Sequence, residues 1–311
     1  MFKVYSYSRK YFLKMKNIFI IGCGFLGSSL LRRIHKKKLA KKIFIYEKSP
    51  KNIKKIKKLK LPGVLVDKLQ EGVLQSGLII FCTPMSEYKS IILDINNHLT
   101  QKHIITDIGS SKLKSSEMIT KNLKNGISWT PSHPIAGSEV SGPQFGKSNI
   151  FENKWCVLIK GKKSNIKHIK YLKSFWKKMG SKTVVMSAEK HDKIFSITSH
   201  LPHLIAYNLV KSAQDFEKKQ KNNLLKYSAG GLRDFSRIAA SNEIMWRDIF
   251  FDNKNNLSRA IDLFIKNLNS FKRDISTKNN KSILKKLIQT KKVRSQIIKL
   301  KLDVNKPDFG R

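Results

Sequence analysis

The sequence predicts an α/β fold in which a doubly wound parallel sheet is followed by an all-α domain. In the first half of the chain, short and almost continuously apolar segments alternate with helix-like segments. That pattern is typical of parallel strands that are buried on both faces. After about residue 188 the strand-like segments stop and long amphipathic segments follow. The length of 311 residues suits about two domains of this kind.

The expected strands come in a regular order with helices between them. "SSLLRRIHKKK", "SEYKSIILDINNHL" and "NIKHIKYLKSFWKKMG" read as helices. The βαβ rhythm is that of a sheet with helices on both faces. Strands are predicted at residues 17–22, 42–47, 77–83, 103–109, 155–161 and 182–187, with a further strand-like segment near 127–129.

These patterns place the boundaries of the chain's parts. We expect residues 15–187 to form the α/β domain and 188–299 the helical domain. We expect residues 1–14 to be a ragged extension, with Met15 as an alternative start, and 300–311 to be a frayed basic tail. The basic N-terminus and the apolar run after it resemble a signal peptide. However, Gly22, Gly24 and Gly27 interrupt that run with the spacing of a binding motif.

The charge is unusual, because 63 Lys+Arg stand against 21 Asp+Glu and give a formal net charge of +42. A basic chain can bind nucleic acid. The lysines are spread along the whole chain, however, and no RNA-binding signature accompanies them. We therefore expect no nucleic-acid partner, and a positive field that attracts an anionic substrate.

Cysteine usage favours a reduced compartment. Cys23, Cys82 and Cys156 lie in or beside apolar runs, and there is no C-x-x-C spacing. Neither a disulfide framework nor a metal site is implied. No further apolar run is long enough to span a membrane, so a cytoplasmic protein is expected.

A glycine-rich motif predicts dinucleotide binding. Gly22, Gly24 and Gly27 form G-x-G-x-x-G around Phe25 and Leu26, directly after the first strand and at the start of a helix. The first glycine permits a tight turn, the second lets the backbone approach a pyrophosphate, and the third allows close packing of helix on strand. Glu47 follows at the end of the second strand, where a carboxylate binds ribose hydroxyls and repels a 2′-phosphate. The sequence therefore favours NAD over NADP in a Rossmann-type domain, although Lys48 leaves NADP open.

Other candidate site residues follow later strands. Thr83 and Pro84 end one strand and Ser110 follows another, at the edge of the sheet where ligands bind. In "SHPIAGSE" we expect His133 to sit on a rigid His-Pro turn above the nicotinamide. There it would act as a general base, with Ser110 orienting it.

The helical domain offers substrate-binding candidates. His200 and His203 are three residues apart in "SHLPH" and share a helix face. No third ligand suggests a metal, so substrate contact is the better interpretation. Arg233 and Arg237 are four residues apart and suit a carboxylate, because guanidinium groups bind carboxylates bidentately.

Together, "GCGFLGSSL", "DIGSSK", "HPIAGSE", "SHLPH" and "GGLRDFSRIAAS" with a following Trp resemble the prephenate/arogenate dehydrogenase family of tyrosine biosynthesis, over roughly residues 16–298. The resemblance implies NAD-dependent oxidative decarboxylation of prephenate or arogenate and an intertwined homodimer. It implies His133 as the base and Ser110 as its orienting group. For the substrate, it implies contacts from Arg237, His203, Ser199 and Arg233, and from Trp246 of the partner subunit.

Three alternatives remain open at this point. The chain could be another two-domain dehydrogenase that acts on a small hydroxy acid, although such enzymes leave "SHLPH" without a role. It could be a basic nucleic-acid-binding protein with an inactive Rossmann fold. It could also be a catalytically silent NAD sensor, which the presence of His133 and Arg237 argues against.

Overall fold

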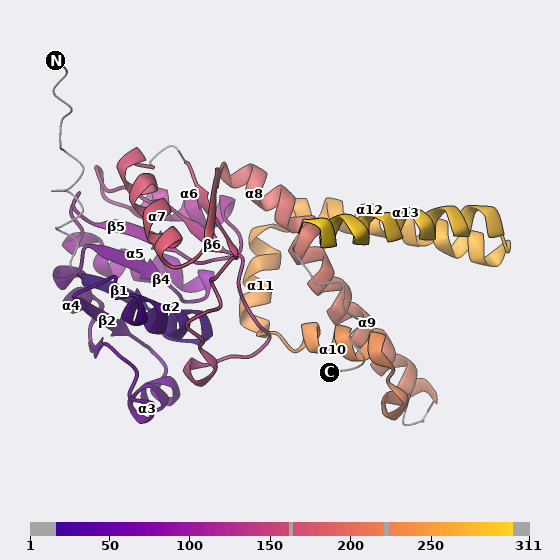
Figure 1. Ribbon diagram of the computed structural model, residues 1–311, viewed down its shortest axis with the longest axis horizontal. Coiled ribbons are helices and arrows are strands. Elements are labelled where there is room, and N and C mark those ends of the chain that lie inside the picture. Colours follow the sequence, from indigo (N-terminus) through magenta and orange to yellow (C-terminus); the bar gives the residue numbers. More distant parts are fainter. Residues whose placement is uncertain (1–16, 162–163, 221–223, 301–311) are drawn as a thin grey trace, which may run out of the picture.

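A five-stranded parallel sheet forms the centre of the first half of the chain (Figure 1). The computed structural model describes residues 17–161, 164–220 and 224–300. Our expectations for residues 1–14, for Met15 and for 301–311 lie outside these ranges. The strand order is β3-β2-β1-β4-β5. The strands are β1 (Asn17–Ile21), β2 (Lys42–Tyr46), β3 (Val64–Leu65), β4 (Leu78–Phe81) and β5 (Ile104–Asp107).

Alternation along the strands sends side chains to two separate cores. In β1, Ile18 and Ile20 pack into one core, and Phe19 and Ile21 pack into the other. Helices α2 and α7 cover the first face, and α4, α5 and α6 cover the second. Helices on both faces confirm the predicted doubly wound fold. The helices of this part are α2 (Phe25–Lys36), α3 (Pro50–Lys58), α4 (Leu69–Gln75), α5 (Tyr88–Ile95), α6 (Leu113–Asn122) and α7 (Ile166–Lys178).

A second sheet of three strands, in the order β6-β7-β8, lies beside the first. It contains β6 (Ser132–Pro134), β7 (Trp155–Ile159) and β8 (Lys182–Met186). The last two are the strands expected at 155–161 and 182–187. The strand-like segment near 127–129 contributes a single bridge between Trp129 and Ile105.

The expected His-Pro turn is wrong, because His133 and Pro134 lie in β6, antiparallel to β7. The N–H of Ile135 donates to Trp155, and the N–H of Ile159 donates to the carbonyl of residue 131. Pro134 therefore occupies a position that faces away from β7, on an edge strand, and its missing N–H costs no ladder hydrogen bond.

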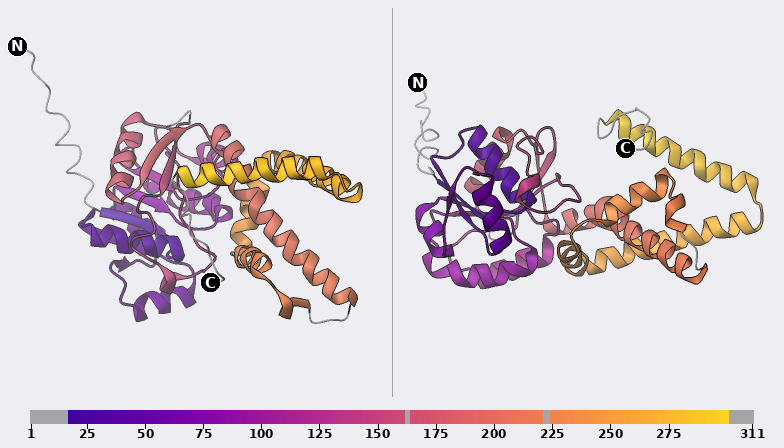
Figure 2. Two further views of the ribbon diagram at one scale, coloured as in Figure 1. Left: turned by 45° about the vertical axis from the view of Figure 1, so that its right-hand side comes forward. Right: turned by 90° about the horizontal axis from the view of Figure 1, so that it is seen from below.

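The helical domain projects away from the sheets (Figures 1 and 2). A π-helical segment, Ser196–His200, joins α8 to α9. Helix α10 packs along α9, and α12 and α13 form a long hairpin that points away from the α/β domain (Figure 2). The helices are α8 (Ala188–Phe195), α9 (Leu201–Gln220), α10 (Gly230–Ala239), α11 (Glu243–Asp252), α12 (Lys254–Ser276) and α13 (Asn280–Lys299).

Candidate active site

The glycine-rich turn between β1 and α2 has the shape that a dinucleotide needs. Gly22 has a φ of +91°, which only glycine adopts without strain. A Cβ on Gly27 would lie 2.1 Å from the carbonyl oxygen of Gly22, so helix and strand touch there. A Cβ on Gly24 would meet nothing within 4 Å. The start of α2 has neither a side-chain cap nor an acidic residue. Its first N–H groups thus face open space, where an anion can bind.

Glu47 is held tightly beside this turn. Its Oε2 accepts a hydrogen bond of 2.8 Å from the Cys23 N–H, and its Oε1 accepts one of 2.9 Å from the Ser49 N–H. The carboxylate is therefore fixed at the end of β2, next to the glycine turn. Each oxygen keeps a second lone pair that a hydroxyl group can reach.

Thr83 lies directly across the turn from Gly22. Its Cγ2 would be 2.9 Å from a Cβ on Gly22. Its buried Oγ1 has no partner among the described residues, which is an unsatisfied polar atom of the kind that a ligand completes. Pro84 is exposed beside it, and Phe25 and Leu26 are half-buried in the first turn of α2. The turn, the fixed carboxylate and the orphan hydroxyl all fit a dinucleotide.

His133 is buried and belongs to a hydrogen-bonded chain of three side chains. Its Nδ1 lies 2.8 Å from Nε2 of His191, and Nδ1 of His191 lies 2.7 Å from Oδ1 of Asp192. A carboxylate can only accept, so Nδ1 of His191 carries the proton that is donated to Asp192. Nε2 of His191 then accepts the Nδ1–H of His133. The remaining nitrogen of His133, Nε2, keeps its lone pair free to accept a proton.

Electrostatics keep the imidazole of His133 neutral. Burial lowers the pKa of His133 well below its usual value, and the neighbouring His191, Lys112 and His200 lower it further. Burial also lowers the pKa of His191, against the opposing effect of Asp192. Neutral imidazole is the form that can act as a general base.

A buried ion pair supports the strand that carries His133. Nζ of Lys112 lies 2.6 Å from Oδ2 of Asp107, and both side chains are almost completely buried. Oδ1 of Asp107 accepts from the Ser132 N–H at 3.2 Å, and the Ser132 hydroxyl donates to the Asp107 carbonyl at 2.6 Å. The two ends of "DIGSSK" thus fix β6 next to β5. Burial lowers the pKa of Lys112, and Asp107 opposes that shift.

In this structure His191 is hydrogen-bonded to His133, and the role expected for Ser110 stays a prediction. In the described part of the chain, no hydrogen bond joins Ser110 to His133, whereas His191 contacts it directly. Ser110 lies half-buried in the loop after β5. Sequence reasoning missed His191 and Asp192 because "AEKHDKIF" is an ordinary amphipathic helix, and only the tertiary fold brings it to β6.

His200 and His203 lie on the same continuous helical run as His191. His203 stacks on Trp246 with ring centroids 3.8 Å apart, and its Nδ1 lies 2.9 Å from the carbonyl of Ser199. His200 is buried and accepts a hydrogen bond of 3.1 Å from Asn253. The π-helical segment shifts the register between His191 and His203, as such segments often do at functional sites.

Trp246, for which the family resemblance implies a contact with the partner subunit's site, is buried within its own subunit. Its side chain is 5% exposed and packs within its own chain against His203 and Phe250. A ring stacked in this way fixes the position of His203 rather than projecting from the subunit.

The arginines of α10 lie on the exposed side of the helical domain. Nη1 of Arg237 lies 3.5 Å from Oε2 of Glu139, and Arg233 is exposed on the same helix. Glu139 follows β6 by only a few residues, so this ion pair brings α10 next to the loop that leaves His133. Both partners are partly exposed and the pair is weak, which leaves the guanidinium available to another carboxylate.

Neither a metal-binding group nor a membrane span is found in the described ranges. No cluster of His, Cys, Asp and Glu suited to a metal ion occurs there. No helix among the described residues is long and apolar enough to cross a membrane.

A Rossmann-type domain with an open glycine turn, followed by a helical domain that adds histidines beside a neutral buried base, defines a two-domain nucleotide-dependent dehydrogenase. Comparison with known proteins specifies the family. Residues 30–185 match the nucleotide-binding domain of prephenate dehydrogenase, and residues 187–290 match its dimerization domain. The chain belongs to the prephenate dehydrogenase family.

Individual relatives agree with this assignment. The chain is 32% identical to cyclohexadienyl dehydrogenase of Zymomonas mobilis over 279 residues, which are 90% of this chain and 95% of that protein. It is 31% identical to prephenate dehydrogenase of Bacillus subtilis over 82% of this chain and 69% of that protein. The crystal structure of prephenate dehydrogenase from A. aeolicus, in complex with hydroxyphenyl propionate and NAD+, superimposes with a TM-score of 0.84 and 32% identity, covering 92% of this chain and 99% of that one.

Proposed function

We propose that the chain catalyses the NAD-dependent oxidative decarboxylation of prephenate to 4-hydroxyphenylpyruvate, of arogenate to tyrosine, or of both. The observation that carries this proposal is the chain Asp192–His191–His133, which leaves a neutral imidazole nitrogen free in a member of the prephenate dehydrogenase family. Both substrates present a ring hydroxyl whose proton must be removed and a carboxylate that must be held.

The chemistry requires one base and a cation. NAD, when bound, supplies the hydride acceptor. His133 accepts the proton of the C4 hydroxyl at Nε2 while the C4 hydride leaves. The bond to the ring carboxylate breaks, carbon dioxide departs, and the electron pair completes the aromatic ring. The proton returns to the oxygen as the phenol forms, so no net proton is consumed. His191 stabilises the charged intermediate state of His133 by accepting its Nδ1–H, and Asp192 in turn holds His191.

We assign substrate binding to the helical domain. Arg237 would take the ring carboxylate in place of its weak contact with Glu139, with Arg233 nearby on α10. His203, held by Trp246 and the Ser199 carbonyl, would contact the ring or its side chain. Ser110 would contact the hydroxyl from the loop after β5. These roles rest on the positions of the side chains and on the family pattern.

The nucleotide would lie across the glycine turn. Gly22, Gly24, Phe25, Leu26 and Gly27 would form the pyrophosphate site. Glu47 would accept the ribose hydroxyls, and because two backbone N–H groups fix its carboxylate, it could not turn away from a 2′-phosphate. Thr83 and Pro84 would border the nicotinamide side.

Purified protein offered prephenate and arogenate separately, with NAD and then NADP, tests the proposal. We expect NADH formation with at least one substrate and a clear preference for NAD. A folded protein that binds NAD and turns over neither substrate would refute the reaction while leaving the cofactor assignment intact.

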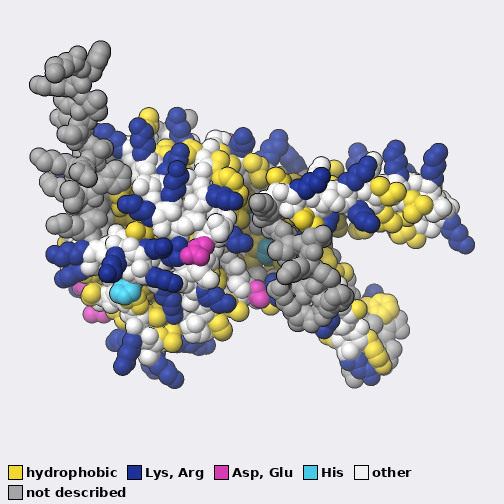
Figure 3. Space-filling view, viewed as in Figure 1, with side chains coloured by type: hydrophobic (Ala, Val, Ile, Leu, Met, Phe, Trp, Pro, Cys, Tyr) yellow, Lys and Arg dark blue, Asp and Glu magenta, His cyan; other side chains and the backbone are white. Residues whose placement is uncertain are grey.

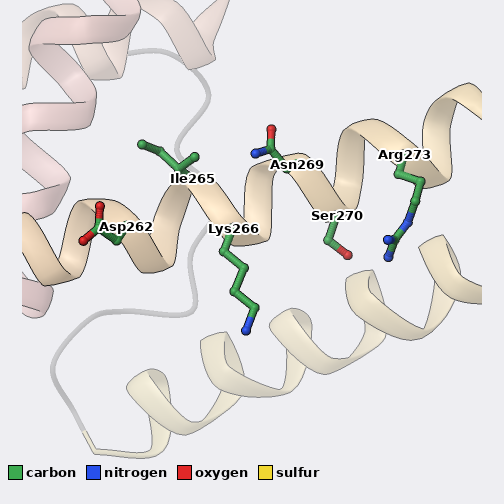
Figure 4. Close-up of a pocket in the computed structure, with 6 residues that line it drawn as sticks. All are labelled: Asp262, Ile265, Lys266, Asn269, Ser270 and Arg273. Carbon is green, nitrogen blue, oxygen red and sulfur yellow. The ribbon is translucent and has the colours of Figure 1, made fainter.

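We also propose a homodimer formed through the helical domain, which matches the family's dimerization domain. Helix α13 has no buried residue, and a pocket of about 550 Å³ opens along α12 (Figure 4). Apolar side chains lie exposed on the projecting hairpin between its lysines (Figure 3), and an apolar surface of this extent favours a protein partner. They are Leu263, Ile265, Leu268, Ile275, Leu284, Leu287, Ile288, Val293 and Ile297.

Leu287→Glu should weaken this dimer, because it places a charge within the apolar surface of α13. Light scattering after gel filtration should then show a lower mass at micromolar concentration. Leu74→Glu is the matched control, since Leu74 is an exposed leucine on α4, in the α/β domain. A monomeric parent protein, or equal behaviour of the two variants, would refute the interface.

The remaining assignments are the extent of the domains, the compartment and the absence of a nucleic-acid partner. We propose an NAD-binding domain at 15–187, a helical domain at 188–299 and a cytoplasmic location.

We also propose that the chain has no nucleic-acid partner. Figure 3 shows Lys and Arg side chains scattered over the visible face rather than gathered in one stripe, which does not favour a nucleic-acid groove. Strong salt-resistant retention on heparin, with no NAD-dependent rise in Tm, would contradict this.

A further inference from the structure

Three polar side chains at the junction of α11 and α12 contact three separate segments of the active site. They are Asp248, Asp252 and Asn253, here called the α11 bracket. Asp248 and Asp252 are four residues apart and share a helix face, and Asn253 ends the helix. All three belong to the helical domain, whereas two of the contacted segments belong to the α/β domain.

The first contact reaches the loop after β4. Oδ2 of Asp248 accepts a hydrogen bond of 2.9 Å from the backbone N–H of Ser86. Asp248 is 7% exposed, so its carboxylate accepts this bond from a largely buried position. Ser86 comes three residues after Thr83, which lies across the glycine turn from Gly22, and two residues after Pro84. The bond therefore fixes the segment that borders the cofactor.

The second contact reaches the loop after β5. The hydroxyl of the buried Ser111 lies 3.3 Å from Oδ2 of Asp252 and 3.3 Å from Sδ of Met85. A hydroxyl has one hydrogen, and the carboxylate is the stronger acceptor. Lys114 lies 3.7 Å from the other carboxylate oxygen. Asp252 thereby holds the loop that contains Ser110, and Met85 links it to the loop of the first contact.

The third contact reaches the helix that supports the base. Nδ2 of Asn253 donates to the backbone carbonyl of Asp192 at 2.8 Å and to Nδ1 of His200 at 3.1 Å. Asn253 is 3% exposed. Its amide thus holds the residue whose carboxylate orients His191 and, through it, His133.

We propose that the α11 bracket is a set of positioning residues through which the helical domain sets the geometry of the cofactor loops and of the base. Helix α11 leads directly into α12, so the proposed dimer interface and the site share one rigid connection. The inference rests on the NAD binding of the proposed function, but not on the identity of the substrate.

The first and the third contact should have different kinetic signatures. Asp248→Ala removes the acceptor of the Ser86 N–H and frees the cofactor loop. We expect the Kd for NAD, measured without substrate, to rise about tenfold, the size expected for one hydrogen bond to a charged group. The value of kcat at saturating NAD should change less than threefold. Asn253→Ala should instead lower kcat about tenfold and leave the Kd for NAD within twofold.

Two control variants separate positioning from folding. Asp248→Asn keeps an oxygen that accepts from Ser86 and should restore the Kd for NAD. Asp215→Ala removes an exposed carboxylate from α9 and should leave both constants unchanged. If Asp248→Ala does not fold, Ser86→Pro deletes the same bond from the donor side and should give the same rise in Kd.

An unchanged Kd for NAD in a folded Asp248→Ala protein would overturn the inference. Parallel losses of NAD affinity, kcat and Tm in the Asp248→Ala and Asn253→Ala variants would also overturn it, because a purely structural role produces that pattern. Because the Kd is measured with NAD alone, the titration of Asp248→Ala tests the inference even if neither prephenate nor arogenate is the substrate.

Discussion

At the scale of single residues, the reactivity of His133 depends on groups that are distant in the sequence. Its imidazole is kept neutral by burial and by the positive neighbour Lys112, and it is oriented by His191. Lys112 is itself buried and paired with Asp107, so its charge stays at a fixed place. The imidazole of His133 is therefore oriented and kept neutral by side chains from β5, from the loop after β5 and from α8, rather than by its neighbours in the sequence.

His133→Asn should remove the proton acceptor and retain a polar side chain of similar reach. We expect kcat to fall about 10²- to 10⁴-fold, the usual contribution of a general base, with the KM for the substrate within a few-fold of its original value. Steady-state rates with prephenate or arogenate provide the measurement. A near-normal kcat would remove His133 from the role of base.

Arg237→Gln should mainly weaken substrate binding, because it removes a guanidinium that can bind a carboxylate bidentately. We expect the KM to rise at least tenfold with a smaller change in kcat. Arg259→Gln is the matched control, because it removes the same charge from an exposed position on α12. Equal effects of the two substitutions would indicate a general field effect and not a specific carboxylate site.

At the scale of elements, α2 and the turn before it combine two different uses of glycine. Gly27 is required by the protein itself, since its Cα lies against the backbone of Gly22. Gly24 borders open space at the N-terminus of α2, so glycine there serves the ligand rather than the fold.

This difference yields a paired prediction. Gly24→Ala should leave Tm almost unchanged and raise the Kd for NAD, because its Cβ enters the space of the pyrophosphate. Gly27→Ala should lower Tm as well, because its Cβ would overlap the Gly22 carbonyl. Thermal unfolding without cofactor, followed by NAD titration, separates the two. A large loss of Tm in Gly24→Ala would mean that the turn is packed and not open.

The strands β1, β2, β4, β5, β7 and β8 and the glycine turn could be predicted from the sequence because local patterns determine them, whereas the two-residue strand β3 has no such pattern. Continuous apolar runs such as 18–21 have few alternatives to a buried strand. The hydrogen-bonded chain Asp192–His191–His133 could not be predicted, because His191 and Asp192 reach β6 only when the two sheets and α8 pack together. The strand that contains His133 was missed because Pro134 reads as a turn signal, although on this edge strand its lack of an N–H has no cost.

At the scale of the whole molecule, the site lies where the α/β domain meets the helical domain, and buried titratable groups gather there. His133, His191, His200 and His203 all have a pKa lowered mainly by burial. Because these histidines are neutral when buried and charged when unfolded in acid, the stability of the contact between the two domains depends on pH. The same burial that keeps the base neutral should therefore make the protein sensitive to acid.

For His200 the pH range of this effect can be stated. Burial lowers its pKa from 6.5 to about 4 in the folded protein. Between these values the unfolded chain binds a proton that the folded chain does not, so the free energy of unfolding falls as the pH falls through this range. Above pH 6.5 His200 is neutral in both the folded and the unfolded chain, so it causes no loss of stability there. One such group changes the free energy of unfolding by at most about 1.4 kcal/mol per pH unit, and the other buried histidines act in the same direction.

Urea unfolding at a fixed protein concentration, from pH 7.5 to 4.5, should therefore show a loss of stability that begins near pH 6.5 and grows toward pH 4.5. His200→Asn keeps an acceptor for the Asn253 amide but does not titrate, so its slope against pH should be smaller by up to about 1.4 kcal/mol per pH unit. If the slope of His200→Asn matched that of the parent protein, His200 would have to be protonated in the folded state as well. Its Nδ1 could then not accept the hydrogen bond from Asn253, and this prediction would be wrong.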